Sequence, residues 1–495
     1  MDKKRLVFFL IYSFAIMLFC TFSSPLMGYL HVDSAVFFTI GRCMKKGMVV
    51  YRDLFDHKGW YIYFFNFLGA CISDRTTLGL YIVESLFLFA DMILCFLIGS
   101  LYLDKHRSVL FSLIMSGGLL NYFTHEAGNV TEYYAVTFVF ISLYLVVLYD
   151  RKTSGDYPAI HMLIHGICAG VCFFIRPNLV MMFGAVPLVM LIIQFAMKKY
   201  VNVFRTLLAG IGGLMLSFTP PLLYAWITGC FRDMFFQMIV FNLKYTGRMS
   251  LLQKLKGSMT NPAALISLLL LIISLVIVVR NCRTYLRVMF ILASVFSLAS
   301  ICLSGRGYGH YFEYLIPLFS PAVLYFCSKL PAAYPASSKH KRLLAAGIVL
   351  VIACLTVIIN MRTPIRYVLK RRYHQRMNAS RVIKEEYTMR FGDDQDVKIL
   401  ALRNNASFYN TLGVYPAIKY FYLPAIPYAD YPEAADSQYE AIMSGEFDVI
   451  ISFFESGDHS IYGREDYDTA VCETLSSDYE VAASYGDYQM WIKRP

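Results

Sequence analysis

Long apolar runs dominate the first 360 residues of the chain and alternate with short polar connections. The runs are about 18 to 25 residues long, which is the length that an α-helix needs to cross the hydrocarbon core of a bilayer. Their recurrence predicts a polytopic α-helical membrane protein with about eleven transmembrane helices. The first predicted span covers residues 6–24 and the last covers residues 343–360.

Basic residues between the runs predict how the chain is oriented. Clusters such as Lys3-Lys4-Arg5, Arg151-Lys152 and Lys198-Lys199 occupy every second connection. Because basic loops are retained in the cytoplasm, we expect a multi-pass protein of the cell membrane with a cytoplasmic N-terminus. An odd number of spans then places the longer connections and the tail after residue 360 outside the cell.

Composition agrees with this pattern. Hydrophobic residues make up 57% of the chain and charged residues 16%, with a mean hydropathy of +0.52. A soluble domain carries about a quarter charged residues, so the soluble class is excluded. The net charge of +11 lies in small clusters between apolar runs rather than in one patch. Membrane lipids are therefore expected partners, and nucleic acid is not.

The chain divides into two predicted domains. Residues 1–360 form the transmembrane domain, whose first external loop is long and covers residues 25–76. Residues 361–495 change character and predict a small extracytoplasmic α/β domain.

Within this tail, residues 397–402 and 446–453 predict strands. Residues 479–485 and 488–492 predict a hairpin across Gly486-Asp487. The tract from Tyr415 to Tyr431 is rich in Tyr and Pro, and we expect a loop with exposed rings there.

The first external loop carries the densest set of candidate chemical groups. Asp33 follows the first span, where it would be either the N-cap of the next helix or a general base for an acceptor. Lys58 follows Asp56 and His57 at the foot of a span. Its amine would either extend to the membrane interface or bind a lipid phosphate.

Further polar groups fall in the other external connections. Glu126 and Glu132 flank a turn, where they would be solvated, act as acid and orienting group, or hold a divalent metal together with Asp33. Arg176 interrupts an apolar stretch, and Arg306 and His310 lie among tyrosines. With Lys58, these three cations predict an anion site on the outer face, or else they anchor the ends of spans.

Several short motifs of the chain, taken in their order, resemble those of the GT-C superfamily of polyprenyl-phosphate-sugar glycosyltransferases. Within that superfamily, the chain specifically resembles the bacterial relatives of protein O-mannosyltransferases and of the lipid A aminoarabinose transferase. The chain has Gly59-Trp60 where that family usually has Pro-Pro, and Ser34 where relatives often have Glu. The matching residues are Asp33, Asp56-His57-Lys58, Asn129-x-Thr131-Glu132, Arg176-Pro177-Asn178, Phe241-Asn242-x-x-Tyr245 and Arg306-Gly307-Tyr308-Gly309-His310-Tyr311.

The resemblance implies an inverting transfer of a sugar from a polyprenyl-phosphate-linked donor to a cell-envelope acceptor, which is a glycan, a lipid or a protein. Asp33 would be the catalytic base, without a covalent intermediate or a required metal. The remaining candidates would bind the donor phosphate (Lys58, Arg176, Arg306 and His310) or orient the substrates (Glu126, Glu132, Asp56 and His57).

Two other functions remain open from the sequence. A transporter or flippase of a lipid-linked sugar would also need cations at one membrane face, but no internal repeat is visible in the chain. A structural partner in a membrane complex would use the tail as its binding module.

Overall fold

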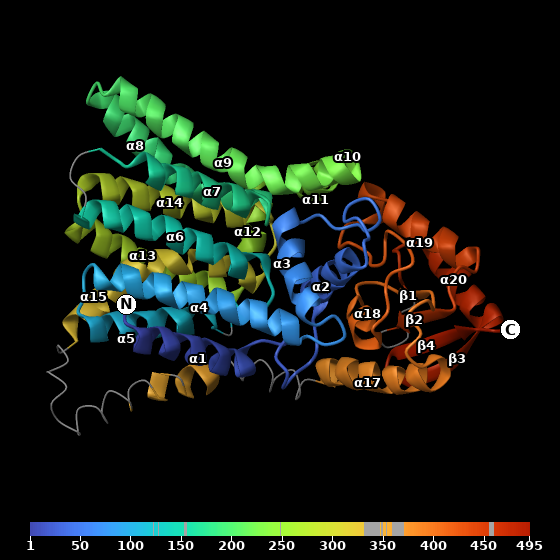
Figure 1. Ribbon diagram of the computed structural model, residues 1–495. Helices are drawn as coiled ribbons and strands as arrows, with labels where there is room; N and C mark the ends of the chain where they lie inside the picture. The colour runs from blue at the N-terminus through green and yellow to red at the C-terminus, as the bar shows by residue number, and fades with distance from the viewer. Residues whose placement is uncertain are drawn as a thin grey trace.

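The computed structural model describes residues 1–495 except 122, 127, 153–155, 248, 331–346, 348–349, 353, 359–370 and 455–459. A helical bundle occupies one half of the molecule, and a smaller unit containing a sheet occupies the other half (Figure 1). Half of the predicted last span, 343–360, lies outside the described residues.

Long apolar helices build the bundle, so the chain is a multi-pass membrane protein. Six segments of the described chain are long and apolar enough to cross a membrane: α4 (Leu78–Ser100), α6 (Thr131–Lys152), η1 with α8 (Pro177–Ala196), α9 (Tyr200–Thr228), α13 (Pro262–Asn281) and α14 (Thr284–Leu303). Other predicted spans are helical but are shorter or carry more charge: α1 (Lys3–Cys20), α5 (Lys105–Leu119), α7 (Ala159–Phe173), and η3 (Gly309–Phe319) with α15 (Ser320–Lys329).

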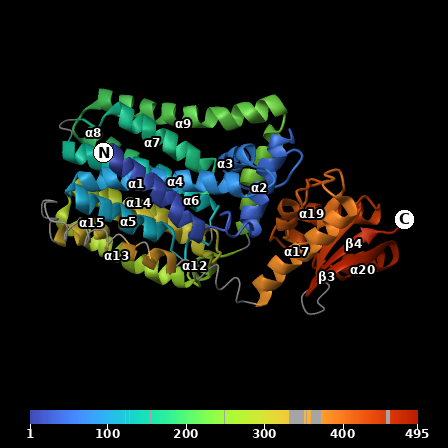
Figure 2. The same cartoon turned by 60° about the horizontal axis from the view of Figure 1, so that its bottom comes forward.

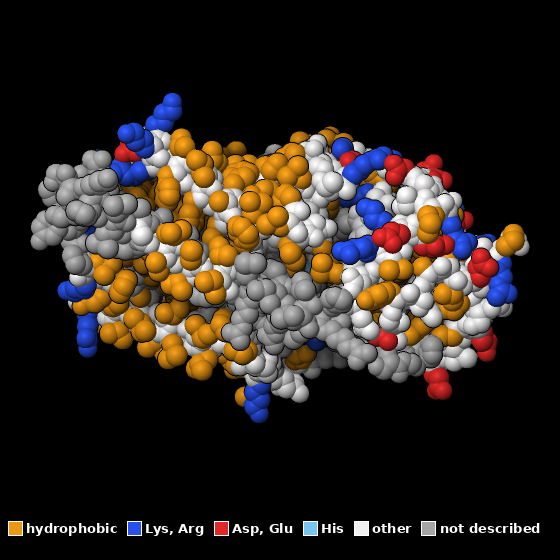
Figure 3. Space-filling view, turned by 90° about the horizontal axis from the view of Figure 1, so that it is seen from below, with side chains coloured by type: hydrophobic (Ala, Val, Ile, Leu, Met, Phe, Trp, Pro, Cys, Tyr) orange, Lys and Arg blue, Asp and Glu red, His pale blue; other side chains and the backbone are white. Residues whose placement is uncertain are grey.

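The surface of the two halves differs in the way that a membrane requires. Hydrophobic side chains cover the bundle half, whereas charged side chains gather at its far end and over the half that contains the sheet (Figure 3). Exposed residues on α13 include Leu265, Leu269 and Ile272, which are 66%, 54% and 57% exposed. Such a continuous apolar surface is stable in lipid rather than in water.

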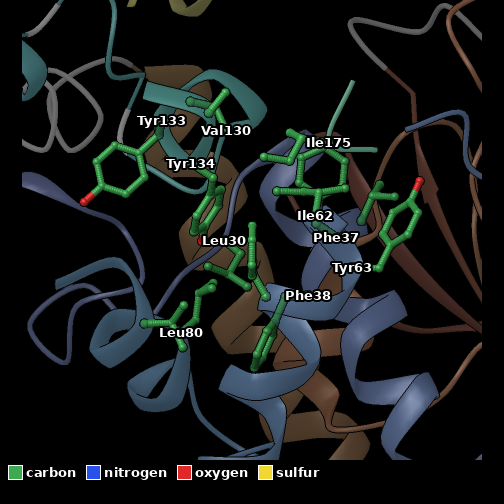
Figure 4. Packing of buried hydrophobic residues seen from close by; sticks show 14 of the residues in the cluster. Leu30, Phe37, Phe38, Ile62, Tyr63, Leu80, Val130, Tyr133, Tyr134 and Ile175 are labelled. Carbon is green, nitrogen blue, oxygen red and sulfur yellow. The ribbon is translucent and has the colours of Figure 1, made fainter. Parts of the chain in front are cut away.

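The first long connection, predicted over residues 25–76, folds into two helices, α2 (Val32–Lys45) and α3 (Trp60–Ile72), which lie between the two halves (Figure 1). Phe37 of α2 and Tyr63 of α3 belong to one buried cluster with their neighbours, and their rings meet edge to face (Figure 4). Gly41 permits this close approach, because a Cβ there would lie 2.5 Å from the backbone of Asn66. The connection is therefore part of the core and not a free loop.

Between α9 and α13 the chain forms four short helical segments. They are α10 (Phe231–Phe235), η2 (Phe236–Phe241), α11 (Asn242–Gly247) and α12 (Leu251–Ser258).

The C-terminal unit (residues 371–495) contains a four-stranded sheet in the order β1-β2-β4-β3. β1 and β2 are parallel, and β4 is antiparallel to both β2 and β3. The strands are β1 (Ile399–Ala401), β2 (Val449–Phe453), β3 (Tyr479–Tyr485) and β4 (Tyr488–Lys493). The helical segments are α17 (Arg371–Phe391), α18 (Ser407–Leu412), η4 (Tyr428–Asp430), α19 (Glu433–Met443) and α20 (Glu465–Asp478).

Local turn chemistry explains the hairpin. β3 pairs with β4 as the sequence predicts, and Tyr485 stands opposite Tyr488. Gly486 between them has a φ of +59°, which a glycine adopts without strain. Figure 2 shows α17 crossing beside this sheet.

The prediction of exposed rings between Tyr415 and Tyr431 is wrong for most of the tract. Phe421 is fully buried, and Tyr422 and Tyr431 are buried as well. Tyr431 stacks on Phe55 of the first long connection. These rings pack between the two halves of the molecule, so they are interior residues of the assembled chain.

Candidate functional site

A cavity of about 920 Å³ lies where the bundle, α2 and the C-terminal unit meet. Most of the site residues predicted from the sequence lie on its wall: Asp33, Asp56, His57, Lys58, Glu126, Arg176 and His310. Segments far apart in the sequence supply them, so the fold creates the site. Arg306 and Glu132 do not line the cavity but contact residues that do.

Asp33 is the second residue of α2, and the N-cap of that helix is His31. The N-cap alternative for Asp33 is therefore wrong. Its carboxylate lines the cavity, and within the described chain it has no hydrogen bond or ion pair. Its charge acts on two imidazoles, those of His57 and His310. An unbonded carboxylate between two histidines is free to accept a proton from a ligand.

Lys58, His57 and Asp56 form a chain of polar contacts. Nζ of Lys58 lies 2.7 Å from Nε2 of His57, and Nδ1 of His57 lies 3.3 Å from Oδ1 of Asp56. An ammonium group only donates, so His57 accepts at Nε2 and carries its proton at Nδ1, toward Asp56. Burial and the Lys58 charge lower the pKa of His57, which agrees with a neutral ring.

Asp56 is buried, and both of its carboxylate oxygens are bonded within the protein. Tyr422 donates to Oδ1 at 2.8 Å and Tyr63 donates to Oδ2 at 2.9 Å. Burial raises the pKa of Asp56, but His57, Lys58 and Tyr422 outweigh it and lower the pKa to about 2. The geometry thus places Asp56 beside His57, where the negative charge of the carboxylate favours a proton on Nδ1.

Gly59 fixes the direction of this loop. The N–H of Gly59 donates to the carbonyl of Ile175 at 2.9 Å, and the N–H of Tyr61 donates to that of Phe174 at 2.8 Å. A Cβ on Gly59 would lie 2.1 Å from the Phe174 oxygen. Proline has no N–H to donate, so a proline at position 59 could not make the hydrogen bond to Ile175. Gly59 therefore explains why this chain differs from the Pro-Pro that is usual in the family it resembles. Lys58 is thereby aimed from a rigid backbone.

Another part of the cavity wall carries a network of charges. Glu126 accepts from Nδ1 of His310 at 2.7 Å and from the N–H of Gly309 at 2.8 Å. Nε2 of His310 lies 4.0 Å from Glu132, which is also ion-paired with Arg176. Burial lowers the pKa of His310, but the two carboxylates outweigh it and raise the pKa to about 9. His310 is therefore a cation at neutral pH.

Arg176 and Arg306 both lie against tyrosine rings. The Arg176 guanidinium stands 4.1 Å from the ring centre of Tyr311, and that of Arg306 stands 5.1 Å from the ring centre of Tyr245. Arg306 also donates to the carbonyl of Ala425 at 3.4 Å. Cation–π contact orients a guanidinium without neutralising its charge. Arg306 thus keeps its charge behind Tyr245, whereas Arg176 at the wall shares its charge with Glu132.

The sequence analysis missed the contribution of the C-terminal unit to the wall. Asn404, Tyr422, Pro424 and Ala425 all line the cavity. The dense Tyr and Pro content of residues 415–431 was a signal, since many rings in a short external loop indicate a contact surface. In the described part of the chain, no group of three or more His, Cys, Asp or Glu is placed to hold a metal ion.

Comparison with family models and with characterised protein sequences gives no match. Solved structures do match over the whole chain. ArnT from Cupriavidus metallidurans bound to undecaprenyl phosphate superimposes with a TM-score of 0.66 at 11% identity, over 99% of this chain and 98% of ArnT. The apo state of the same ArnT superimposes with a TM-score of 0.62, over 99% of this chain and 97% of ArnT. The mycobacterial arabinofuranosyltransferase AftD gives 0.51 at 11% identity, over 100% of this chain and 40% of AftD.

These structures are GT-C glycosyltransferases, and the likeness extends through both halves of the molecule. The fold implied by the ordered motifs is confirmed, and the chain shares the GT-C fold of these structures.

Proposed function

We propose that the protein is an inverting glycosyltransferase that moves a sugar from a polyprenyl-phosphate-linked donor to a cell-envelope acceptor on the outer face of the membrane. One observation carries the proposal: the unbonded carboxylate of Asp33 shares a cavity with Lys58, Arg176 and His310. Such a reaction needs one base and a set of cations for the leaving group. The similar ArnT structure holds undecaprenyl phosphate, which supports a polyprenyl phosphate as the carrier.

In the proposed step, Asp33 accepts the proton of an acceptor hydroxyl. The acceptor oxygen attacks the anomeric carbon from the side opposite the phosphate, and the bond between that carbon and the phosphate oxygen breaks. The electron pair leaves with the polyprenyl phosphate, and the anomeric configuration inverts. Attack and departure are concerted, so no covalent enzyme intermediate forms.

The charge that develops on the phosphate is the main barrier to this step. Lys58 and Arg176 would neutralise it, because both project cationic groups into the cavity. His310 would add a third charge, and Arg306 would act from behind Tyr245. Because the side chains of Arg176 and His310 are mostly buried, their charges act more strongly than they would in bulk water.

The remaining predicted residues would act through their neighbours. Asp56 and His57 would hold Lys58 in place, since Nε2 of His57 is the only acceptor bonded to its amine among the described residues. Glu126 and Glu132 would orient His310 and Arg176 rather than touch the sugar. The sequence-based role of substrate orientation is therefore refined to orientation of the cations.

A reconstituted transfer assay tests the proposal. Purified protein in lipid is given a radiolabelled polyprenyl-phosphate sugar and an envelope extract, and wild type is compared with Asp33→Asn. We expect a fall in transfer of about 10³-fold or more, since an amide cannot act as the base. Asp74→Asn is the matched control, because Asp74 is ion-paired with Lys45 at the surface.

Equal transfer by wild type and Asp33→Asn would contradict the assigned base. If no donor supports transfer, transport of the lipid-linked sugar across vesicles becomes the next measurement. The orientation is tested separately with a tag at the C-terminus. We expect the tag to be accessible from outside intact cells, and a cytoplasmic tag would contradict an outer-face reaction.

A further inference from the structure

Asn404 lies at the cavity wall with an amide that bonds to no other group in the described part of the chain. The residue follows β1 and lines the cavity. Its Oδ1 is buried and meets no donor among the described residues. A buried polar atom without a partner destabilises the folded state. Beside a cavity, such an atom is typical of a group that serves a ligand.

The backbone presents this amide in an unusual conformation. Arg403, just before it, has a φ of +61°, which few residues other than glycine adopt. The N–H of Leu423 donates to the carbonyl of Arg403 at 3.0 Å and ties the tyrosine-rich tract to the same turn. The turn lies beyond the carboxyl end of β1, in the parallel pair of the sheet. Strained turns and the carboxyl ends of parallel strands are common ligand sites.

The chemistry of this wall differs from that of the facing wall. The described residues that the C-terminal unit contributes, Asn404, Tyr422, Pro424 and Ala425, carry no charge. An amide oxygen needs a donor, and a phosphate or carboxylate group offers only acceptors. A hydroxyl group both donates and accepts. The wall therefore favours a neutral ligand with hydroxyl groups.

We propose that Asn404 forms the acceptor subsite and that the acceptor is a neutral glycan. One sugar hydroxyl donates to Oδ1 of Asn404, and the neighbouring hydroxyl accepts from Nδ2. Tyr308 lines the same cavity with 42% of its surface exposed and offers an apolar ring to the C–H face of a sugar. This inference rests on the proposed function, in which the acceptor supplies the hydroxyl that Asp33 deprotonates.

Saturation-transfer NMR on the full chain in nanodiscs tests the subsite without any reaction. The probe is the neutral oligosaccharide fraction released from cell envelopes, and no donor sugar is present. We expect Asn404→Ala to weaken oligosaccharide binding about tenfold, which is the effect of losing one or two hydrogen bonds. Asn281→Ala is the matched control, because Asn281 lies at the exposed end of α13 and bonds only its own helix.

Binding of undecaprenyl phosphate is measured on the same samples and is expected to be equal in all three proteins, which shows that the variants are folded. If Asn404→Ala does not bind undecaprenyl phosphate, Asn404→Asp is used in its place. Aspartate has the same shape as asparagine but lacks the amide donor.

Equal oligosaccharide binding by the variant and wild type would overturn the proposal. So would a wild type that binds a Ser- and Thr-rich peptide or phosphatidylglycerol vesicles but not the oligosaccharides. Glycan binding without transfer in the separate donor assay would contradict the proposed reaction and not the glycan subsite.

Discussion

The hydroxyl of Tyr422 donates a 2.8 Å hydrogen bond to Oδ1 of Asp56, joining residues that are 366 positions apart in the sequence. Asp56 in turn faces His57, and His57 holds the amine of Lys58. The C-terminal unit is thus connected to the proposed phosphate-binding lysine through three consecutive polar contacts. A change on the sheet side of the molecule can therefore alter the donor site.

Removing this hydroxyl is expected to weaken donor binding. Tyr422→Phe keeps the ring but removes one of two donors to Oδ1 of the buried Asp56 and leaves the backbone N–H of His57, so the carboxylate beside His57 and Lys58 is held less firmly. We expect the donor KM to rise about tenfold. Tyr420→Phe is the control, because its hydroxyl bonds Tyr431 and not Asp56. An unchanged donor KM in Tyr422→Phe would show that the contact is only structural.

The same contact marks the limit of prediction from sequence. The hairpin of β3 and β4 and the strand cores were predictable, because strand periodicity and a Gly-Asp turn are local signals. The burial of Tyr422 was not predictable, because its partner Asp56 lies 366 positions away in the sequence. A tyrosine in a Pro-rich tract has the same local pattern whether it faces water or another part of the chain.

The sequence predicted which residues gather at the cavity but not all of their contacts. Asp33, Lys58 and Arg176 were identified by residue type and position, and all three line the cavity. Asp56 was expected to orient substrate, yet both of its oxygens are bonded within the protein. Whether a carboxylate has all its hydrogen bonds within the protein depends on residues that folding brings together. A single sequence does not reveal these partners.

Gly59 offers a test of how firmly the Lys58 loop must be docked. Gly59→Ala would place a methyl group 2.1 Å from the carbonyl oxygen of Phe174, so the loop must move away from α7. We expect a loss of about 2 to 4 kcal/mol in stability and transfer reduced at least tenfold. Gly212→Ala is the control, because a Cβ there meets no atom within 4 Å. Thermal unfolding in nanodiscs measures the stability of both variants. Equal stability of Gly59→Ala and Gly212→Ala would contradict the close packing of Gly59 against Phe174.

Arg42 is expected to make the contact that contributes most to the stability of the interface between α2 and the C-terminal unit. It is buried and donates to the carbonyls of Tyr409 at 2.8 Å and Val414 at 3.2 Å. Arg42→Met leaves both carbonyls without that donor, at a cost of about 2 to 4 kcal/mol. The exposed pair of Arg75 with Asp393 also joins the halves, but Arg75→Met should cost under about 1 kcal/mol.

Limited proteolysis distinguishes these two variants. We expect Arg42→Met to release the C-terminal unit at protease concentrations that leave wild type and Arg75→Met intact. Release by Arg75→Met alone would reverse the assignment.

His310 gives the protein a predictable dependence of stability on pH. Its pKa is raised to about 9 by Glu126 and Glu132 despite burial, whereas an unfolded histidine titrates near 6.5. Because the folded pKa is the higher one, the stabilisation is complete below about pH 6.5 and is lost as the pH rises through about 9. The shift corresponds to about 3 kcal/mol at most.

His310→Gln keeps a polar side chain of similar reach but cannot become charged. We therefore expect the unfolding temperature of wild type to fall more steeply than that of His310→Gln between about pH 6.5 and 9. His106→Gln is the control, since His106 is the second residue of α5 and does not line the cavity. Parallel curves for wild type and His310→Gln would contradict a protonated His310 between the two carboxylates. Curves that converge at high pH would support it, because deprotonation removes the charge that the substitution also removes.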